Sequence, residues 1–239
     1  MVRTKSVLGF VIPVIAAFLL LSTPAFATSV TFSVSGGGPG NDDSATADFT
    51  FSGGVLDLKL TNTSNMTSIA NILDGFNFSY TGTANTFALI SVAAGGVVNC
   101  VDPGGCSDVS GSYSSPYTWA INDNSPSPIE IRAGGTALHP FGIADDSILT
   151  NYALDGLTNA QHNPMLLNYA TFHFTYQGTI TGISGANFLF GTTPDSVPGT
   201  GPGNGNNNPQ DAVPEPASLL LVGSGLALAA RRARRKQNS

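Results

Sequence analysis

The segment Tyr169-Ala170-Thr171-Phe172-His173-Phe174-Thr175-Tyr176 decides the fold, because its apolar and polar side chains alternate. Phe172, Phe174 and Tyr176 share one face of an extended chain, and Thr171, His173 and Thr175 share the other, since successive strand side chains point to opposite faces. One apolar and one polar face are typical of an antiparallel strand that lies between a core and solvent. The segment therefore predicts a half-buried β-strand.

The same period recurs along the chain between Gly, Asn and Ser breaks. Two runs around Phe49 and Leu58 are separated by Ser52-Gly53-Gly54, which predicts a hairpin. Further strand candidates are residues 30–34, 76–80, 87–92, 117–121, 129–132 and 188–190, and only residues 68–73 predict a helical turn. Eight or nine short strands without a fixed-length repeat predict an all-β fold, a single antiparallel β-sandwich whose jelly-roll or immunoglobulin-like topology stays undecided.

The charge of the body limits its partners. Residues 28–211 contain two basic side chains, Lys59 and Arg132, against fourteen acidic ones, a net charge of −12. Nucleic acid is an unfavourable partner, because phosphate binding needs clustered Lys and Arg. Charged residues make up 10% of the whole chain, against roughly 25% in ordinary globular proteins. A hydroxyl-rich surface with few charged residues suits a protein among polysaccharides or in a surface layer.

The two cysteines indicate an oxidising compartment. Cys100 and Cys106 flank Asp102-Pro103-Gly104-Gly105, a sequence with strong turn chemistry. We expect a disulfide across this loop, with a metal pair or two free thiols as alternatives. Because the closed loop is short, the bond would fix a loop more than it would hold the domain together.

The N-terminus has the three parts of a secretory signal peptide. Arg3 and Lys5 form the positive region, residues 7–21 form the apolar region, and Ala25-Phe26-Ala27 is a small-x-small cleavage site. Cleavage would leave Thr28 as the new N-terminus. An uncleaved anchor is the alternative, although the apolar region is short for a membrane span.

The C-terminus carries a second export signal, which has three parts. The motif Pro214-Glu215-Pro216 precedes fourteen uncharged residues, 217–230, which reach about 21 Å as a helix against roughly 30 Å of bilayer hydrocarbon. The basic residues that follow resist translocation, so the body would lie outside the cytoplasm. A core helix with a basic end is the alternative, but a span with no polar face has nothing to present to solvent. The basic residues are Arg231, Arg232, Arg234, Arg235 and Lys236.

These two ends resemble those of PEP-CTERM proteins, an exported bacterial class, whose tail family is also labelled an ice-binding protein C-terminal domain. The resemblance implies that Pro214, Glu215 and Pro216 are recognised by a membrane-embedded exosortase, which cleaves near the motif and sends the protein toward the cell surface. It covers about a ninth of the chain, and residues 217–230 are short for the class, so cleavage and permanent anchoring both stay open. It transfers no activity to the body.

The chain is accordingly expected to have four parts. They are a signal peptide at residues 1–27, a β-sandwich domain at 28–195, a flexible Gly/Pro/Asn linker at 196–212, and a PEP-CTERM sorting tail with a short transmembrane span at 213–239. Signal peptidase and an exosortase-type membrane protease are the expected partners during export. The protein would pass through the inner membrane to the cell surface or the extracellular space.

Catalytic motifs are missing from the sequence. His139, His162 and His173 form no pair at helical metal spacing, and neither a Gly-x-Ser-x-Gly motif nor a phosphate loop is present. Each histidine is expected to be a loop or surface residue, and we expect no catalytic residue, no cofactor and no metal. Asp42-Asp43 and Asp145-Asp146 leave calcium open, since adjacent carboxylates can supply oxygen ligands, but solvated turns are the default.

Sugar binding is the main rival to a structural role. Tyr113, Tyr117, Trp119 and Tyr152 could stack on a glycan, although alternation of Tyr117, Trp119 and Ile121 favours a core position for Trp119. Ice binding would need a regular threonine array, and the sequence shows only scattered pairs such as Thr61 and Thr63, Thr81 and Thr83, or Thr179 and Thr181. The sequence thus predicts an exported, non-enzymatic structural protein of an exopolysaccharide or surface layer. A glycan-binding module or adhesin is the alternative, and a secreted hydrolase or an ice-binding protein are weaker ones.

Overall fold

The computed structural model describes residues 27–37, 42–101, 105–112, 117–122, 128–134, 140–150, 161–191 and 195–202. These residues form β-strands and three short 3₁₀ helices, which confirms the predicted all-β class. The 3₁₀ helices are η2 (Ile69–Asn71), η3 (Ser110–Ser112) and η4 (Asp146–Leu149). Ser68 caps η2 by accepting a hydrogen bond from the Ala70 N–H, so the predicted helical turn at residues 68–73 is confirmed.

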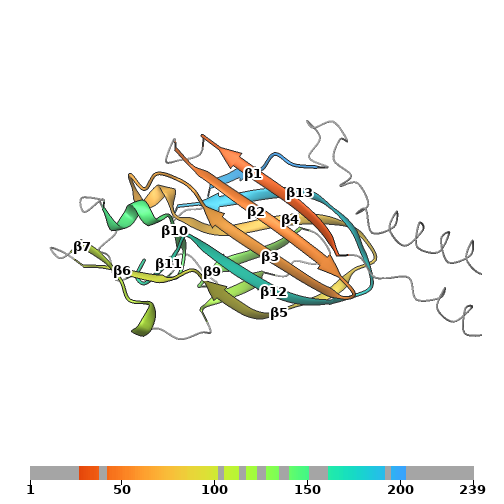
Figure 1. The fold of residues 1–239 in the computed structure, drawn as a ribbon. Coiled ribbons are helices and arrows are strands. Elements are labelled where there is room, and N and C mark those ends of the chain that lie inside the picture. Colours follow the sequence, from red (N-terminus) through yellow and green to blue (C-terminus); the bar gives the residue numbers. More distant parts are fainter. Residues whose placement is uncertain are drawn as a thin grey trace, which may run out of the picture.

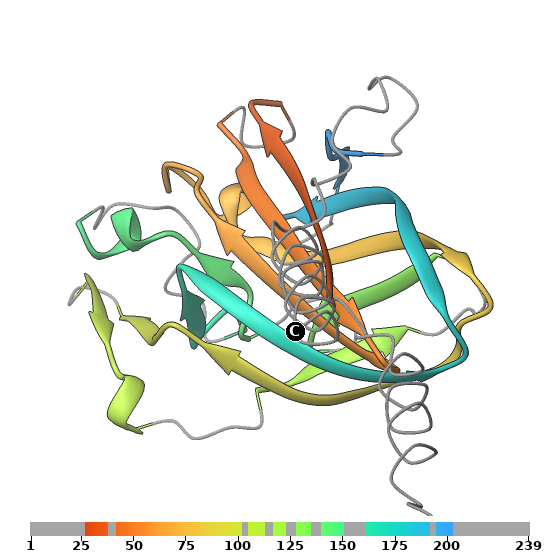
Figure 2. The ribbon, with the colours of Figure 1, turned by 45° about the vertical axis from the view of Figure 1, so that its right-hand side comes forward.

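The strands form two sheets that lie one behind the other in both views (Figures 1 and 2). The five-stranded sheet has the order β1 (Thr28–Ser35), β2 (Ser44–Ser52), β3 (Val55–Asn62), β12 (Tyr169–Gln177), β5 (Asn85–Ala94). The nine-stranded sheet has the order β14 (Asp195–Pro198), β13 (Ile180–Phe190), β4 (Leu73–Gly82), β10 (Ile143–Ala144), β11 (Met165–Leu167), β6 (Val97–Val101), β7 (Gly105–Asp108). In the same sheet β9 (Ile129–Ala133) pairs with β4, and β8 (Trp119–Asn122) pairs with β9.

The strongest sequence patterns give the predicted strands. In β12 the alternate residues Ala170, Phe172, Phe174 and Tyr176 are buried, and the residues between them are partly exposed. The predicted hairpin around Gly53-Gly54 joins β2 to β3, and both glycines have a positive φ, which glycine adopts without steric cost. Strands β6, β7, β10, β11 and β14 were not predicted.

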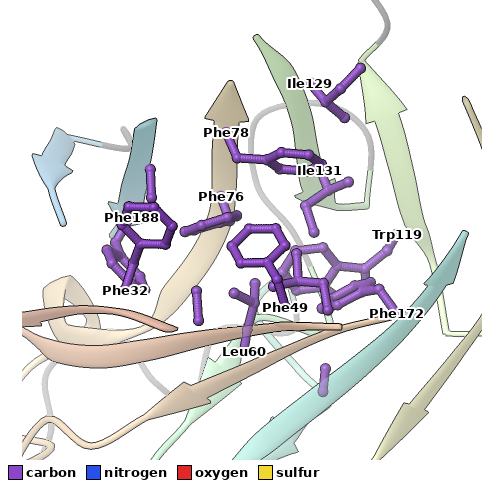
Figure 3. Close-up of a cluster of buried hydrophobic side chains, with 14 of the residues drawn as sticks. Phe32, Phe49, Leu60, Phe76, Phe78, Trp119, Ile129, Ile131, Phe172 and Phe188 are labelled. Atoms are coloured by element: carbon purple, nitrogen blue, oxygen red, sulfur yellow. The ribbon is translucent and has the colours of Figure 1, made fainter. Parts of the chain in front are cut away.

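Aromatic rings from both sheets meet in one core (Figure 3). The Phe49 ring of β2 lies 5.8 Å from the Phe76 ring and 5.1 Å from the Phe78 ring of β4 in the other sheet. Aromatic pairs at these distances contribute on the order of 1 kcal/mol beyond their buried area. A second, smaller cluster around Met66, Ile148 and Met165 lies under η2 and η4. The two sheets are therefore held together mainly by apolar and aromatic packing.

The last described residues return to the first strand. Thr200 forms a bridge to Ser33 of β1, and Ser196–Pro198 pair with β13 as part of β14. The linker predicted to begin at residue 196 is therefore wrong in its first residues, because this Gly- and Pro-containing segment finds ladder partners that the sequence does not reveal. The folded body extends at least to Pro202, and residues 203–212 lie outside the described residues.

Candidate functional site

The predicted signal cleavage site lies at the edge of the body. Ala27 and Thr28 are exposed, and Thr28 is the first residue of β1, opposite Phe51 of β2. Ala25 lies outside the described residues. Cleavage before Thr28 would leave β1 complete, so the predicted cut is compatible with the fold.

The C-terminal sorting residues fall outside the part of the chain that the structure describes. They are Pro214, Glu215 and Pro216, the apolar residues 217–230, and Arg231, Arg232, Arg234, Arg235 and Lys236. Within the described ranges no helix is long and apolar enough to cross a membrane.

The predicted disulfide is present. Cys100 of β6 and Cys106 of β7 lie directly opposite each other in the hairpin, and their sulfur atoms are bonded. The Cys100 N–H donates a hydrogen bond to Oδ1 of Asn163, which fixes the base of the hairpin to the segment before β11. The disulfide thus joins β6 and β7, two neighbouring strands at one edge of the nine-stranded sheet.

His173 makes the closest polar contact on the outer face of the five-stranded sheet. Its Nδ1 lies 2.6 Å from Oδ1 of Asp57 on β3, and both side chains are partly exposed. Ser91 of β5 lies opposite His173 in the sheet register, but no hydrogen bond joins these two described residues. The order Asp, His, Ser across three strands therefore lacks the contact that a nucleophile needs with its base.

The other two histidines differ from each other. His162 lies in a turn, as expected, but its side chain is buried, and this burial lowers its pKa. His139 lies outside the described residues. Among the described residues, no group of three or more His, Cys, Asp or Glu side chains is arranged to hold a metal ion.

The two carboxylate pairs have structural surroundings. Asp43 is fully buried and accepts a hydrogen bond of 2.9 Å from Nδ2 of Asn71, so the expectation of a solvated turn is wrong for this residue. Asp145 caps η4 by accepting from the Ser147 N–H, and Asp146 is exposed. These contacts give the carboxylates of Asp43 and Asp145 roles within the fold.

The aromatic candidates for sugar stacking do not form an exposed platform in the described part of the chain. Trp119 is 7% exposed, lies edge-to-face on Phe172 at 4.7 Å, and donates from Nε1 to the Phe141 carbonyl at 3.0 Å. Tyr117 packs on Phe141 and is partly buried. The core position favoured for Trp119 is confirmed, and Tyr113 and Tyr152 lie outside the described residues.

Threonines gather on the outer face of the five-stranded sheet, a grouping that the sequence did not reveal. Thr31, Thr46, Thr50, Thr61, Thr171 and Thr175 occupy the outward positions of β1, β2, β3 and β12. Asp48, Asp57 and Lys59 lie among them in the same rows, and the Lys59 ammonium sits 4.4 Å from the centre of the Tyr169 ring. Because charges interrupt the array, this face lacks the uninterrupted threonine rows that ice binding would need.

A hollow of about 250 Å³ opens at one end of the body, and we call it the end pocket. Its floor contains Phe51, Tyr176 and Ile180, which are nearly buried. Its rim is formed by the start of β1 and by the turns between β2 and β3 and between β12 and β13; the rim residues are Thr28, Ser52, Gly53, Gly54, Gly178 and Thr179. The sequence did not predict this pocket, because its walls come from three segments that are distant along the chain.

One buried carboxyl group has a shifted pKa. Asp74 of β4 is 5% exposed, and burial raises the pKa of its carboxyl group to about 7 despite the opposing positive charge of Arg132. The Arg132 guanidinium in turn lies 2.6 Å from Oε1 of Glu130 on β9. Asp74 is therefore a group that can change its charge near neutral pH.

Comparison with known proteins identifies a sorting motif in the tail. Residues 212–236 match the PEP-CTERM protein-sorting motif, which marks a bacterial protein exported toward the cell surface and sorted by exosortase. Neither a curated protein nor a solved structure matches the chain. Any function of the body has to be argued from its own residues.

Proposed function

We propose that this chain is an exported protein of the cell surface or extracellular matrix, with a non-enzymatic structural role in an exopolysaccharide or surface layer. Its body is a β-sandwich with the structural role, and its tail is cleaved at Pro214-Glu215-Pro216 by an exosortase-type protease. The match of residues 212–236 to the sorting motif carries the export and sorting part of this proposal. The domain order that goes with it is a signal peptide, a β-sandwich, a linker from about residue 203, and the sorting tail.

Several features of the body support a structural role. The two sheets share one aromatic core, a disulfide closes the β6–β7 hairpin, and Thr200 ties the last described segment to β1. Disulfides form and persist in oxidising compartments, so the bond between Cys100 and Cys106 fits an exported protein. The body's low content of charged residues suits contact with hydrated neutral polymers.

The arrangement of polar residues favours a non-enzymatic body. Asp57 and His173 form a pair on an open sheet face, and Ser91 makes no hydrogen bond to His173. Nucleophilic catalysis needs a positioned base and a site that excludes water. The pair is explained equally well as a cross-strand contact of the kind that stabilises sheets.

The alternative role, glycan binding, rests on a different site from the one that the sequence suggested. Trp119 and Tyr117 pack inward, so they do not offer a stacking surface. The end pocket, with an aromatic floor and hydroxyl groups on its rim, is the feature that supports this alternative.

The sorting proposal is tested by mass and location in the native host. The protein is compared with a variant in which Pro214, Glu215 and Pro216 are replaced by alanine, and with a control in which Asn206, Asn207 and Asn208 are replaced instead. We expect the native protein and the control to begin at Thr28, to lack the residues after the motif and to leave the membrane. The motif variant should keep its tail and stay in the membrane fraction. If the native protein also keeps its tail there, the chain is a tail-anchored surface protein and the proposed cleavage is wrong.

A further inference from the structure

We propose that the end pocket binds one neutral sugar ring, such as the terminal hexose of an extracellular polysaccharide. The proposal rests on the extracellular role argued above, because that role places the pocket among glycans. It assigns to the body a ligand class and a site that neither the tail match nor the sequence motifs provide.

The charge of the pocket selects a neutral ligand. None of the described residues that line it has a charged side chain. After the proposed cleavage, the α-amino group of Thr28 would add one positive charge at the rim, and this group can donate hydrogen bonds to hydroxyl groups. A body of net charge −12 repels anions, and a cation would find no carboxylate ligand among these lining residues. A neutral molecule is neither repelled by the body nor in need of a counter-charge.

The size and floor of the pocket fit a single ring. Its volume of about 250 Å³ lies below the usual range of sites for drug-sized ligands, roughly 300–1,000 Å³. Tyr176 and Phe51 contribute aromatic surface to the floor, and the apolar face of a sugar ring packs on such surfaces. A disaccharide or longer chain would have to extend out over the rim.

The rim offers the hydrogen-bonding groups that a sugar needs. The hydroxyl groups of Thr28, Ser52 and Thr179 can each donate and accept, which matches the hydroxyl groups of a sugar. Gly53 has a positive φ and open space where a side chain would stand, so a ligand can approach its backbone closely, whereas neighbouring backbone oxygens fill that space at Gly54 and Gly178. Hydroxyl and backbone groups therefore surround an apolar floor.

The rim is also held in place before any ligand binds. The Tyr176 N–H donates to the Gly54 carbonyl at 2.9 Å, and the Thr83 N–H donates to the Thr179 carbonyl at 2.8 Å. These bonds tie one turn to β12 and the other to the turn between β4 and β5. Binding would then cost little conformational entropy, which matters for a small ligand with few contacts.

The test uses the protein isolated from its host, in whichever processed form the fractionation experiment yields, so that a failure of sorting and a failure of sugar binding are separate results. Saturation-transfer difference NMR is recorded with glucose, galactose, mannose and N-acetylglucosamine, at concentrations up to roughly ten times an expected Kd on the order of 1 mM. We expect transfer to the ring protons of at least one of these sugars. Absence of transfer to all four would overturn the proposal.

Two variants localise the binding. Ser52→Trp and Thr179→Trp each place an indole ring at the rim, and either should weaken the transfer signal by about tenfold or more. The matched control is Ser35→Trp, at the other end of β1, which should leave the signal unchanged. Circular dichroism confirms that each variant is folded, and two positions guard against one failing to fold. Unchanged binding in a folded pocket variant would place the sugar elsewhere and overturn the assignment.

Discussion

Ser33 and Thr200, 167 residues apart in the chain, exchange two backbone hydrogen bonds. The Ser33 N–H donates to the Thr200 carbonyl at 2.9 Å, and the Thr200 N–H donates to the Ser33 carbonyl at 2.7 Å. The Thr200 hydroxyl adds a third bond to the same Ser33 carbonyl at 3.0 Å. The next residue, Gly201, lies so close to the Phe32 ring that a Cβ there would overlap it. Strand β1 and residues 200–201, near the end of the described body, therefore form one structural unit.

Replacing Thr200 by proline should loosen this unit. Proline removes the backbone N–H and the hydroxyl donor together, and we expect the free energy of unfolding to fall by about 1–2 kcal/mol. The measurement is urea denaturation of the exported protein. Thr200→Val is the control, because it keeps both backbone bonds and should cost clearly less. Equal losses in the two variants would show that the hydrogen bond of the Thr200 N–H contributes nothing to stability.

Removal of the disulfide should weaken the body without unfolding it. The bond between Cys100 and Cys106 closes a loop with a sequence separation of only 6, and chain-entropy arguments give about 2 kcal/mol for so short a loop. We expect the double Cys→Ser variant to lose roughly this amount in urea denaturation and to keep the native near-ultraviolet circular dichroism. A variant that is unfolded in buffer would mean that the bond holds the whole domain together.

The fluorescence of the chain's single tryptophan should report a buried indole. Trp119 lies against Phe172 in the core, so its emission should be blue-shifted and weakly quenched by acrylamide. Trp119→Ala should cost about 3–5 kcal/mol of stability, whereas Trp119→Phe should cost less because a ring still fills the site. A red-shifted, easily quenched emission would instead place the indole in solvent and restore it as a sugar-stacking residue.

The parts of the fold that could be predicted are those in which one strand carries its own signal. In β12 and in the β2–β3 hairpin, alternation and turn glycines are local properties, and both predictions are confirmed. Strands β10 and β11 have only two and three residues, too few for a period to be visible. They exist because neighbouring strands offer partners, and this information is not local.

In the candidate site, too, local patterns could be predicted from the sequence and contacts between distant segments could not. The cysteine pair and the tail motif are contiguous patterns, and both are found. The end pocket, the threonine-bearing sheet face and the pairing of β14 each depend on the register between distant segments. Asp43 shows the limit of composition, since a carboxylate in a polar sequence was expected in solvent, yet Asn71 binds it inside the body.

Asp74 should make the stability of the body depend on pH. Burial raises the pKa of its carboxyl group from 3.8 to about 7. Between these two pH values the folded protein therefore holds a proton that the unfolded chain has lost. The contribution of the protonated carboxyl group to the free energy of unfolding is complete below about pH 4 and is lost as the pH rises toward 7, at up to about 1.4 kcal/mol per pH unit. Asp74→Asn removes the titrating group. It should therefore have little effect below about pH 4, and its stabilising effect relative to the native chain should grow by a few kcal/mol between pH 5 and pH 8.

Urea denaturation of both proteins across this pH range gives the comparison, and the difference between them isolates Asp74. That difference is needed because His162 acts in the opposite direction: burial lowers its pKa, so its contribution is lost as the pH falls below about 6.5. His162 is present in both proteins and cancels. If the two stability curves stay parallel from pH 5 to pH 8, Asp74 is charged throughout, and the positive charge of Arg132 outweighs the cost of its burial.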